Sequence, residues 1–191
     1  RAIPCVREHL LSQDLIYVGG GSLVSLIGVW KAHGIDEIMR EAWEAGVVLC
    51  GLSAGALCWF EDSVTAYYEA PERVDGMGFL PWSFTAHYDT EPERRIAFHR
   101  HLCGGMRPGY AADDGVALHF RGLALHRVVS SRPTAGATAL RWGPRGVLEE
   151  RLEARYLGNV ATSARESETI AAAAKPVTGG GPVAAAAPAL V

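Results

Sequence analysis

Residues 47–60 read VVLCGLSAGALCWF, and this stretch decides the fold that we expect. The first four residues form an apolar run typical of a buried parallel strand. The run Ala54–Phe60 predicts a helix. Between them Ser53 is flanked by Gly51 and Gly55, whose missing Cβ atoms let strand and helix pack closely at a sharp corner. Such a corner lifts a hydroxyl out of the sheet, so Ser53 is a candidate nucleophile. The five-residue pattern alone occurs often by chance, so the flanking elements carry the prediction.

A second buried strand is expected upstream, at residues 15–18, which read LIYV and end in Gly19-Gly20-Gly21. Ser22 is placed to cap one helix, and Gly34 and Gly46 are placed to end two. Strands that bracket helical sequence predict an α/β fold with an open, mostly parallel sheet flanked by helices. The three glycines also fit a simple tight turn or a phosphate-binding loop, but the Gly-Lys-Ser/Thr of a P-loop is missing.

Farther along the chain the pattern changes. Turn formers and acids predominate over residues 61–82, so we expect mostly loop there, with one short strand near Phe79. Thr90-Glu-Pro-Glu93 has the spacing of a capping box and predicts a helix that ends near Gly104. After residue 110, strand-like runs predict β-hairpins, one of which turns at Arg121-Gly122. Further strands are expected at residues 84–87, 137–142 and 152–157.

The length of 191 residues suits one α/β domain, which we expect over residues 1–158. Residues 171–191 are almost all Ala, Gly, Pro and Val, so we expect a low-complexity, disordered tail over 159–191. The chain begins at Arg1 rather than at Met, and the start has no features of a signal peptide. We therefore expect the natural N-terminus to be missing.

Composition excludes several classes of function. The formal charge of −3 gives no electrostatic reason to expect nucleic acid or an anionic membrane as a partner. No apolar run is long enough to span a bilayer. The four cysteines contain no Cys-x-x-Cys pair, so we expect no zinc site, and reduced thiols in a cytoplasmic protein are the default interpretation.

A serine nucleophile requires a base within hydrogen-bond reach and an acid that orients the base. We assign the base to His87 and the acid to Asp114, which lies in an Asp-Asp-Gly sequence that also suits an ordinary turn. Asp113 and Glu69 stay open as alternative acids. A lone histidine is more often structural than catalytic, and the chain has seven, so this pairing is a hypothesis until the residues are placed in space.

Backbone N–H groups are suited to stabilise the oxygen that becomes negative during acyl transfer. We assign this oxyanion hole to the N–H groups of Gly21 and Ala54. Gly20 lies beside the first of these donors and Tyr88 follows the base, so we expect both to contact the substrate.

Four stretches, in this order, resemble the peptidase E (aspartyl dipeptidase) family and its cyanophycinase relatives. They are Tyr17-Val-Gly-Gly-Gly21, Gly51-Leu-Ser-Ala-Gly-Ala-Leu-Cys-Trp-Phe60, Ala86-His-Tyr88 and Asp113-Asp-Gly115. The resemblance runs through most of residues 10–158. It implies a fold like that of class I glutamine amidotransferase domains, and a triad in the order Ser53, His87, Asp114. Family members begin with a further strand and helix, which we expect this chain to lack.

The resemblance implies a serine-type peptidase that hydrolyses short peptides through an acyl-enzyme, without metal or cofactor. We expect a small peptide as its substrate and a monomer or homodimer as its state. An esterase with the same triad and a catalytically inactive amidotransferase-like binding domain are the alternatives. Arg94 and Arg95 are candidates, by their nearness to His87, for holding an N-terminal aspartate. Ser22 stands where aspartyl dipeptidases tend to have Asn, so strict aspartyl specificity is not expected.

Overall fold

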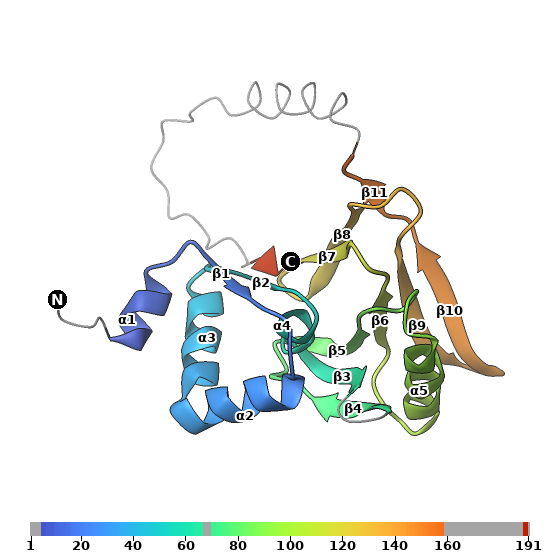
Figure 1. The fold of residues 1–191 in the computed structure, drawn as a ribbon, viewed down its shortest axis with the longest axis horizontal. Helices are drawn as coiled ribbons and strands as arrows, with labels where there is room; N and C mark the ends of the chain where they lie inside the picture. Colours follow the sequence, from blue (N-terminus) through green and yellow to red (C-terminus); the bar gives the residue numbers. More distant parts are fainter. Residues whose placement is uncertain (1–4, 67–69, 159–188, 191) are drawn as a thin grey trace.

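The computed structural model describes residues 5–66, 70–158 and 189–190 (Figure 1). The helices are α1 (Val6–Leu11), α2 (Leu23–His33), α3 (Ile35–Glu44), α4 (Ala54–Leu57) and α5 (Pro92–Cys103). The strands are β1 (Leu15–Val18), β2 (Val48–Gly51), β3 (Phe60–Ala66), β4 (Pro71–Asp75), β5 (Leu80–Thr85), β6 (Gly109–Ala112), β7 (Val116–Arg121), β8 (Ala124–Ser130), β9 (Ala137–Gly143), β10 (Gly146–Leu152), β11 (Arg155–Tyr156) and β12 (Ala189–Leu190). The mixed α/β class expected from the sequence is confirmed.

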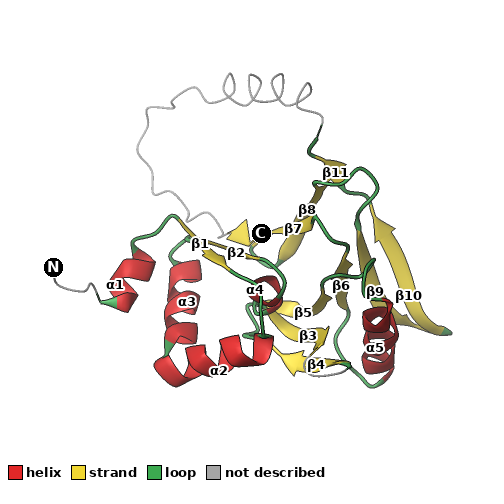
Figure 2. Cartoon of the chain, in the orientation of Figure 1, coloured by secondary structure: helices red, strands yellow, loops and turns green. Residues whose placement is uncertain are grey.

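The strands form two mixed sheets rather than the single, mostly parallel sheet that we expected. Their orders are β1-β2-β12-β7-β8-β11 and β10-β9-β6-β5-β3-β4. Parallel pairing joins β1 to β2 and runs through β3, β5 and β6, whereas the β7–β8 and β9–β10 hairpins add antiparallel strands. Figure 2 shows α2 and α3 gathered at the β1–β2 end and α5 beside β9 and β10.

The N-terminal half follows its sequence signals closely. The Ser22 hydroxyl accepts a hydrogen bond from the Ser25 N–H at 3.2 Å and caps α2, as predicted. Gly34 ends α2 with a φ of 65°, and Gly46 follows α3 with a φ of 96°. Glycine occupies these left-handed conformations at no steric cost, which is why the two helices end where the sequence predicts.

The helix predicted over Ala54–Phe60 is one turn long, because the chain turns away after Leu57. The Cys58 carbonyl accepts the Met77 N–H at 2.8 Å, which ties the end of the turn to a distant segment. Trp59 is 2% exposed and packs its ring against Phe79 with centroids 5.6 Å apart. Tertiary packing therefore ends the helix earlier than its apolar pattern suggests.

The mostly loop assignment of residues 61–82 was wrong, because β3, β4 and the start of β5 lie there. The strand β4 is at the edge of its sheet, and Pro71 at its first position removes no central ladder bond. Asp62 is 1% exposed on β3, where Arg73 of β4 donates to its Oδ1 through Nε at 2.9 Å. Acids and proline that suggested a loop are thus accommodated by a cross-strand ion pair and an edge position.

A shared hydrophobic core joins the two sheets. Phe60 of β3 stacks on Phe84 of β5 with ring centroids 4.6 Å apart. The same Phe60 ring meets Phe120 of β7, in the other sheet, edge-on at 5.7 Å. A second cluster, which includes Val64 and Phe98, lies between α5 and the second sheet. The cluster that contains the three phenylalanines also includes Leu49 of β2 and Ala112 of β6, so the carboxyl ends of β2, β5 and β6 lie in one region of the molecule.

Only two residues of the expected tail over 159–191 are described. Ala189–Leu190 form β12, which pairs with β2 on one side and with β7 on the other. The rest of the tail, and the disorder predicted for it, lies outside the described residues, so the domain boundary stays a prediction. Within the described ranges, no helix has both the length and the apolar character to cross a membrane.

Candidate active site

The serine corner has the strained geometry that its two glycines permit. Ser53 has a φ of 51° and a ψ of −117°, between the end of β2 and the start of α4. A Cβ at Gly51 would clash with the Gly55 backbone, and a Cβ at Gly55 would clash with the Val18 carbonyl. A non-glycine residue at positive φ costs on the order of 1–3 kcal/mol and persists only where its surroundings enforce it. The close packing of β1, β2 and α4 therefore holds the Ser53 hydroxyl out of the sheet.

His87 follows β5 and lies directly against this serine. Its Nε2 is 3.0 Å from the Ser53 Oγ, and its Nδ1 is 2.6 Å from the Asp114 Oδ1. His87 also has a positive φ, 58°, in a turn where its carbonyl accepts the Glu91 N–H at 2.9 Å. The structure thus brings together, in one hydrogen-bonded chain, the three side chains that the sequence singled out.

The carboxylate of Asp114, just past β6, has a second partner that sequence reasoning missed. Thr90 Oγ1 donates to the Asp114 Oδ2 at 3.0 Å. The sequence assigned Thr90 to a capping box, but the N-cap of α5 is Glu91 and has no side-chain capping bond. The predicted helix is present, while its predicted cap is wrong because the threonine hydroxyl is bonded to the carboxylate instead. No local sequence signal distinguishes a threonine that caps a helix from one that donates to a distant carboxylate.

The alternative acids hold other positions. Asp113 is 8% exposed, and its Oδ2 accepts from the Arg151 guanidinium at 2.5 Å and from the Gly136 N–H at 3.0 Å. Its carboxylate therefore anchors the segments after β8 and along β10. Glu69 lies outside the described residues.

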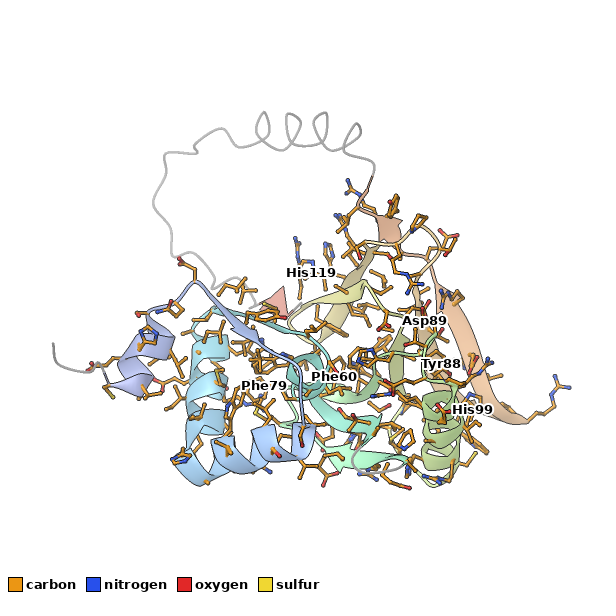
Figure 3. All side chains as sticks on the ribbon, in the orientation of Figure 1. Phe60, Phe79, Tyr88, Asp89, His99 and His119 are labelled. Carbon is orange, nitrogen blue, oxygen red and sulfur yellow. The ribbon has the colours of Figure 1, made fainter. Side chains whose placement is uncertain are left out.

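Two further residues surround the backbone of Asp114. Asp89 Oδ1 accepts the Asp114 N–H at 2.8 Å, and Asp89 Oδ2 accepts from Arg132 Nη1 at 2.7 Å. The same Arg132 nitrogen donates to the Asp114 carbonyl at 3.1 Å. Partial burial acts to raise the pKa of Asp89, but the Asp114 N–H and the Arg132 guanidinium outweigh it and hold this pKa below its usual range. Asp89 is labelled in Figure 3.

The glycine loop lies next to the serine, as the oxyanion assignment requires. A Cβ on Gly20 would be 3.4 Å from the Ser53 Cβ, so there is little room for a side chain between this loop and the corner. Gly21 has a φ of 141°, which non-glycine residues rarely adopt. Ala54 is the first residue of α4, where a backbone N–H has no acceptor within the helix. The roles of these N–H groups stay predictions.

Tyr88 does not share the contacts of its neighbour His87. Its hydroxyl donates to the Glu149 Oε1 of β10 at 2.8 Å, and its ring packs against the second core cluster. Burial and the nearby Glu149 raise the pKa of Tyr88. Figure 3 shows Tyr88 near His99, which belongs to α5. The geometry gives Tyr88 a structural contact, and its substrate-binding role has no support from these distances.

The two arginines considered for an N-terminal aspartate also have other partners. Arg94 is 4% exposed and donates to the Val64 carbonyl at 3.2 Å and to Glu91 at 2.6 Å. Arg95 donates to the Glu149 Oε2 at 2.7 Å. Both guanidinium groups therefore fasten α5 to its surroundings.

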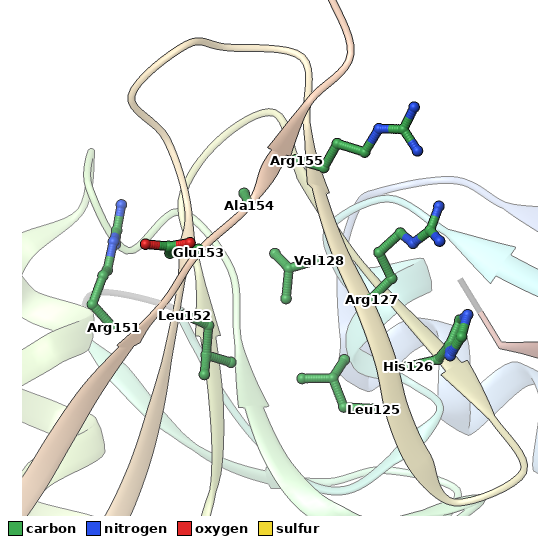
Figure 4. A pocket seen from close by; sticks show the side chains of 9 residues that line it. All are labelled: Leu125, His126, Arg127, Val128, Arg151, Leu152, Glu153, Ala154 and Arg155. Carbon is green, nitrogen blue, oxygen red and sulfur yellow. The ribbon is translucent and has the colours of Figure 1, made fainter. Parts of the chain in front are cut away.

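A cavity of about 660 Å³ lies between β8 and residues 151–155 (Figure 4). Apolar side chains such as Leu125 and Val128 and basic ones such as His126 and Arg127 line it, but none of the three triad side chains does. In the described part of the chain, no group of three or more His, Cys, Asp or Glu side chains is arranged to hold a metal ion.

Comparison with known proteins identifies the family. The family model of peptidase family S51 matches residues 3–128, a range that spans the serine corner, His87 and Asp114. Over 173 residues the chain is 45% identical to a Bacillus subtilis (strain 168) protein named "Uncharacterized peptidase YgaJ", and the alignment covers 83% of this chain and 75% of that relative. The resemblance found in the sequence is thereby confirmed: the chain belongs to peptidase family S51 and is a serine peptidase.

Proposed function

We propose that this enzyme hydrolyses short peptides through a covalent acyl-enzyme formed on Ser53. In this mechanism, the Ser53 Oγ attacks the peptide carbonyl while His87 Nε2 takes the hydroxyl proton. His87 then gives that proton to the leaving amine, and the carbon–nitrogen bond breaks. Water then attacks the acyl carbonyl while His87 takes one of its protons. His87 gives that proton to Ser53 Oγ as the carbon–Oγ bond breaks, which releases the carboxylic acid and restores the Ser53 hydroxyl. Asp114 stays ionised and stabilises the imidazolium that forms in each half.

The observation that carries this proposal is the pair of distances at His87. With its Nδ1–H donated to Asp114 at 2.6 Å, the neutral imidazole presents Nε2 as an acceptor. That nitrogen is 3.0 Å from the Ser53 Oγ, within the reach that proton transfer requires. The side chains of His87 and Asp114 are 27% and 41% exposed, so a substrate has access to the pair.

The oxyanion hole in this proposal consists of the N–H groups of Gly21 and Ala54. The narrow space between Gly20 and Ser53 supports it, because a Cβ on Gly20 would be only 3.4 Å from the Ser53 Cβ. Rigid backbone donors at that place stabilise the negative oxygen of the tetrahedral intermediate. The short α4 adds little of the helix dipole that the longer predicted helix would have supplied.

We also propose that the architecture is related to class I glutamine amidotransferase domains and that the enzyme acts in the cytoplasm. The chain order of serine, histidine and acid, and a serine placed between a strand and a helix, support the first proposal. The four cysteines, all of which are described and unpaired, fit a reducing compartment and support the second.

Substrate class is tested by hydrolysis of a dipeptide panel and of p-nitrophenyl esters. We expect dipeptide cleavage by the wild type and a loss of at least about 10³-fold in kcat for Ser53→Ala. Ser25→Ala, on the exposed face of α2, is the matched control and keeps wild-type kcat. Rapid ester turnover without peptide cleavage would establish the esterase instead. Equal dipeptide turnover by Ser53→Ala and the wild type would refute the acyl-enzyme.

A further inference from the structure

Asp114 belongs to a partly exposed turn that has no regular secondary structure of its own. Asp114 lies between the end of β6 at Ala112 and the start of β7 at Val116, and its side chain is 41% exposed. Such turns are among the mobile parts of proteins unless side chains tie them down. The distance of 2.6 Å between His87 Nδ1 and Asp114 Oδ1 therefore needs a physical cause beyond the two residues themselves.

Both backbone polar groups of Asp114 are held by side chains from other segments. Asp89 accepts the Asp114 N–H at 2.8 Å, and Arg132 donates to the Asp114 carbonyl at 3.1 Å. Asp89 and Arg132 also bond to each other at 2.7 Å, which closes a three-membered network. Charge-assisted hydrogen bonds of this kind are shorter and stronger than neutral ones.

The network connects the turn of the base to the turn of the acid. Asp89 lies two residues after His87, in a turn where the His87 carbonyl accepts the Thr90 and Glu91 N–H groups at 3.2 and 2.9 Å. A displacement of Asp89 would therefore move the backbone on both sides of the bond between His87 and Asp114. Arg132, just past β8, fixes the network to a third segment.

We propose that Asp89 and Arg132 are positioning residues that hold the Asp114 carboxylate in register with His87. The inference rests on the proposed function, because it matters to catalysis only where Asp114 is the triad acid. Neither side chain contacts Ser53 or the imidazole of His87 in the described hydrogen bonds, so both act through Asp114.

The test uses the whole 191-residue chain carrying Asp89→Ala, Arg132→Met or both substitutions. Each variant is assayed on the dipeptide that the wild type cleaves best and on p-nitrophenyl acetate. We expect each single variant to lose about 10- to 100-fold in kcat on both substrates with little change in KM, as for a small misplacement of a reacting group. The double variant is expected to be no slower than the slower single variant, because residues that act in one network are not additive.

Two further variants control for charge and for geometry. Arg127→Met removes an exposed arginine on β8 and is expected to keep the wild-type kcat. Asp89→Asn keeps an oxygen that can accept the Asp114 N–H but loses the charge facing Arg132, so its kcat is expected to lie between those of Asp89→Ala and the wild type. Circular dichroism and the melting temperature establish that each variant is folded at the assay temperature.

Several results would overturn the positioning role. A raised KM for the dipeptide alone, with p-nitrophenyl acetate unaffected, would make Arg132 a substrate contact. The proposal would also be contradicted if the fold-losses in kcat of the two single variants multiplied in the double variant. The same holds if the loss in kcat of each variant equalled the fraction of its molecules that is unfolded at the assay temperature. Asp114→Ala, measured in parallel, distinguishes failure of the proposed function from failure of the positioning role. Wild-type activity in Asp114→Ala refutes the triad itself. An inactive Asp114→Ala together with fully active Asp89 and Arg132 variants refutes the positioning role alone.

Discussion

At the scale of single residues, the site depends on two residues whose backbone has an unfavourable conformation. Ser53 and His87 have φ values of 51° and 58°, and they are the non-glycine residues with positive φ in the described part of the chain. Strain of this kind persists where surrounding packing enforces it, and it is concentrated at functional sites. The glycines at 51 and 55 make room for the first of these residues, which is why the sequence marks Ser53 more clearly than His87.

The adjacent aspartates provide a paired prediction at this scale. Asp114→Asn should leave the fold intact, because the side chain is partly exposed, and should lower kcat about 10⁴-fold through loss of the orienting carboxylate. Asp113→Asn should destabilise the protein by about 1–3 kcal/mol, because the buried carboxylate binds Arg151 and the Gly136 N–H. Urea unfolding and steady-state kinetics on both variants check this division.

The reverse pattern would contradict the assignment. If Asp113→Asn abolishes turnover in a folded protein while Asp114→Asn keeps it, the acid of the triad is not the residue nearest to His87.

At the scale of elements, the site is built from the turns that follow β2, β5 and β6. The sequence predicted β1, β2 and the serine corner well, because apolar runs that end in glycine mark buried strands and tight turns. It missed β3 and β4, where Asp62 and Arg73 are polar residues paired across two strands. Local composition cannot reveal such a partner, since the pairing depends on strands brought together by tertiary folding.

The surroundings of Asp114 were equally beyond local reasoning. Thr90, Asp89 and Arg132 reach Asp114 from 24, 25 and 18 residues away along the chain. Asp and Thr are common in turns and Arg on surfaces, and nothing in their spacing indicates a shared target. The sequence therefore singled out the three side chains that the structure brings together, but not the residues that surround Asp114.

Glu149 provides a prediction for the packing of α5 against β10. Burial acts to raise the pKa of Glu149, but hydrogen bonds from His99 and Tyr88 and the charge of Arg95 outweigh it, so the pKa lies below its ordinary value. A carboxyl group with a lowered pKa in the folded state stabilises that state above the pKa of the unfolded chain, about 4.3 for Glu. This stabilisation is lost as the pH falls toward the folded-state pKa.

Glu149→Gln should therefore lower the free energy of unfolding by about 1 kcal/mol at pH 6, the upper range for partly exposed ion pairs. The difference from the wild type should shrink below about pH 4.3, where the unfolded chain takes up its proton. Urea unfolding followed by tryptophan fluorescence between pH 3 and pH 7 measures it. Glu150→Gln, exposed on the same strand, is the control. A difference that stays constant down to pH 3 would contradict this role for Glu149.

At the scale of the whole molecule, the site exists because two sheets share one core. Ser53 follows a strand of the first sheet, whereas His87 and Asp114 follow strands of the second. The ring of Phe60 contacts Phe84 in its own sheet and Phe120 in the other, which joins the two sheets near these strand ends. Catalysis is therefore expected to require the complete fold, since no single sheet carries all three side chains.

The most direct measurement is the rate and place of labelling by a fluorophosphonate probe, read by mass spectrometry of the intact protein and of its peptides. Our account predicts one adduct per wild-type chain, located on Ser53, with no adduct in Ser53→Ala and labelling slowed by orders of magnitude in His87→Ala. A folded wild-type chain that stays unlabelled, or an adduct on another residue, would contradict it.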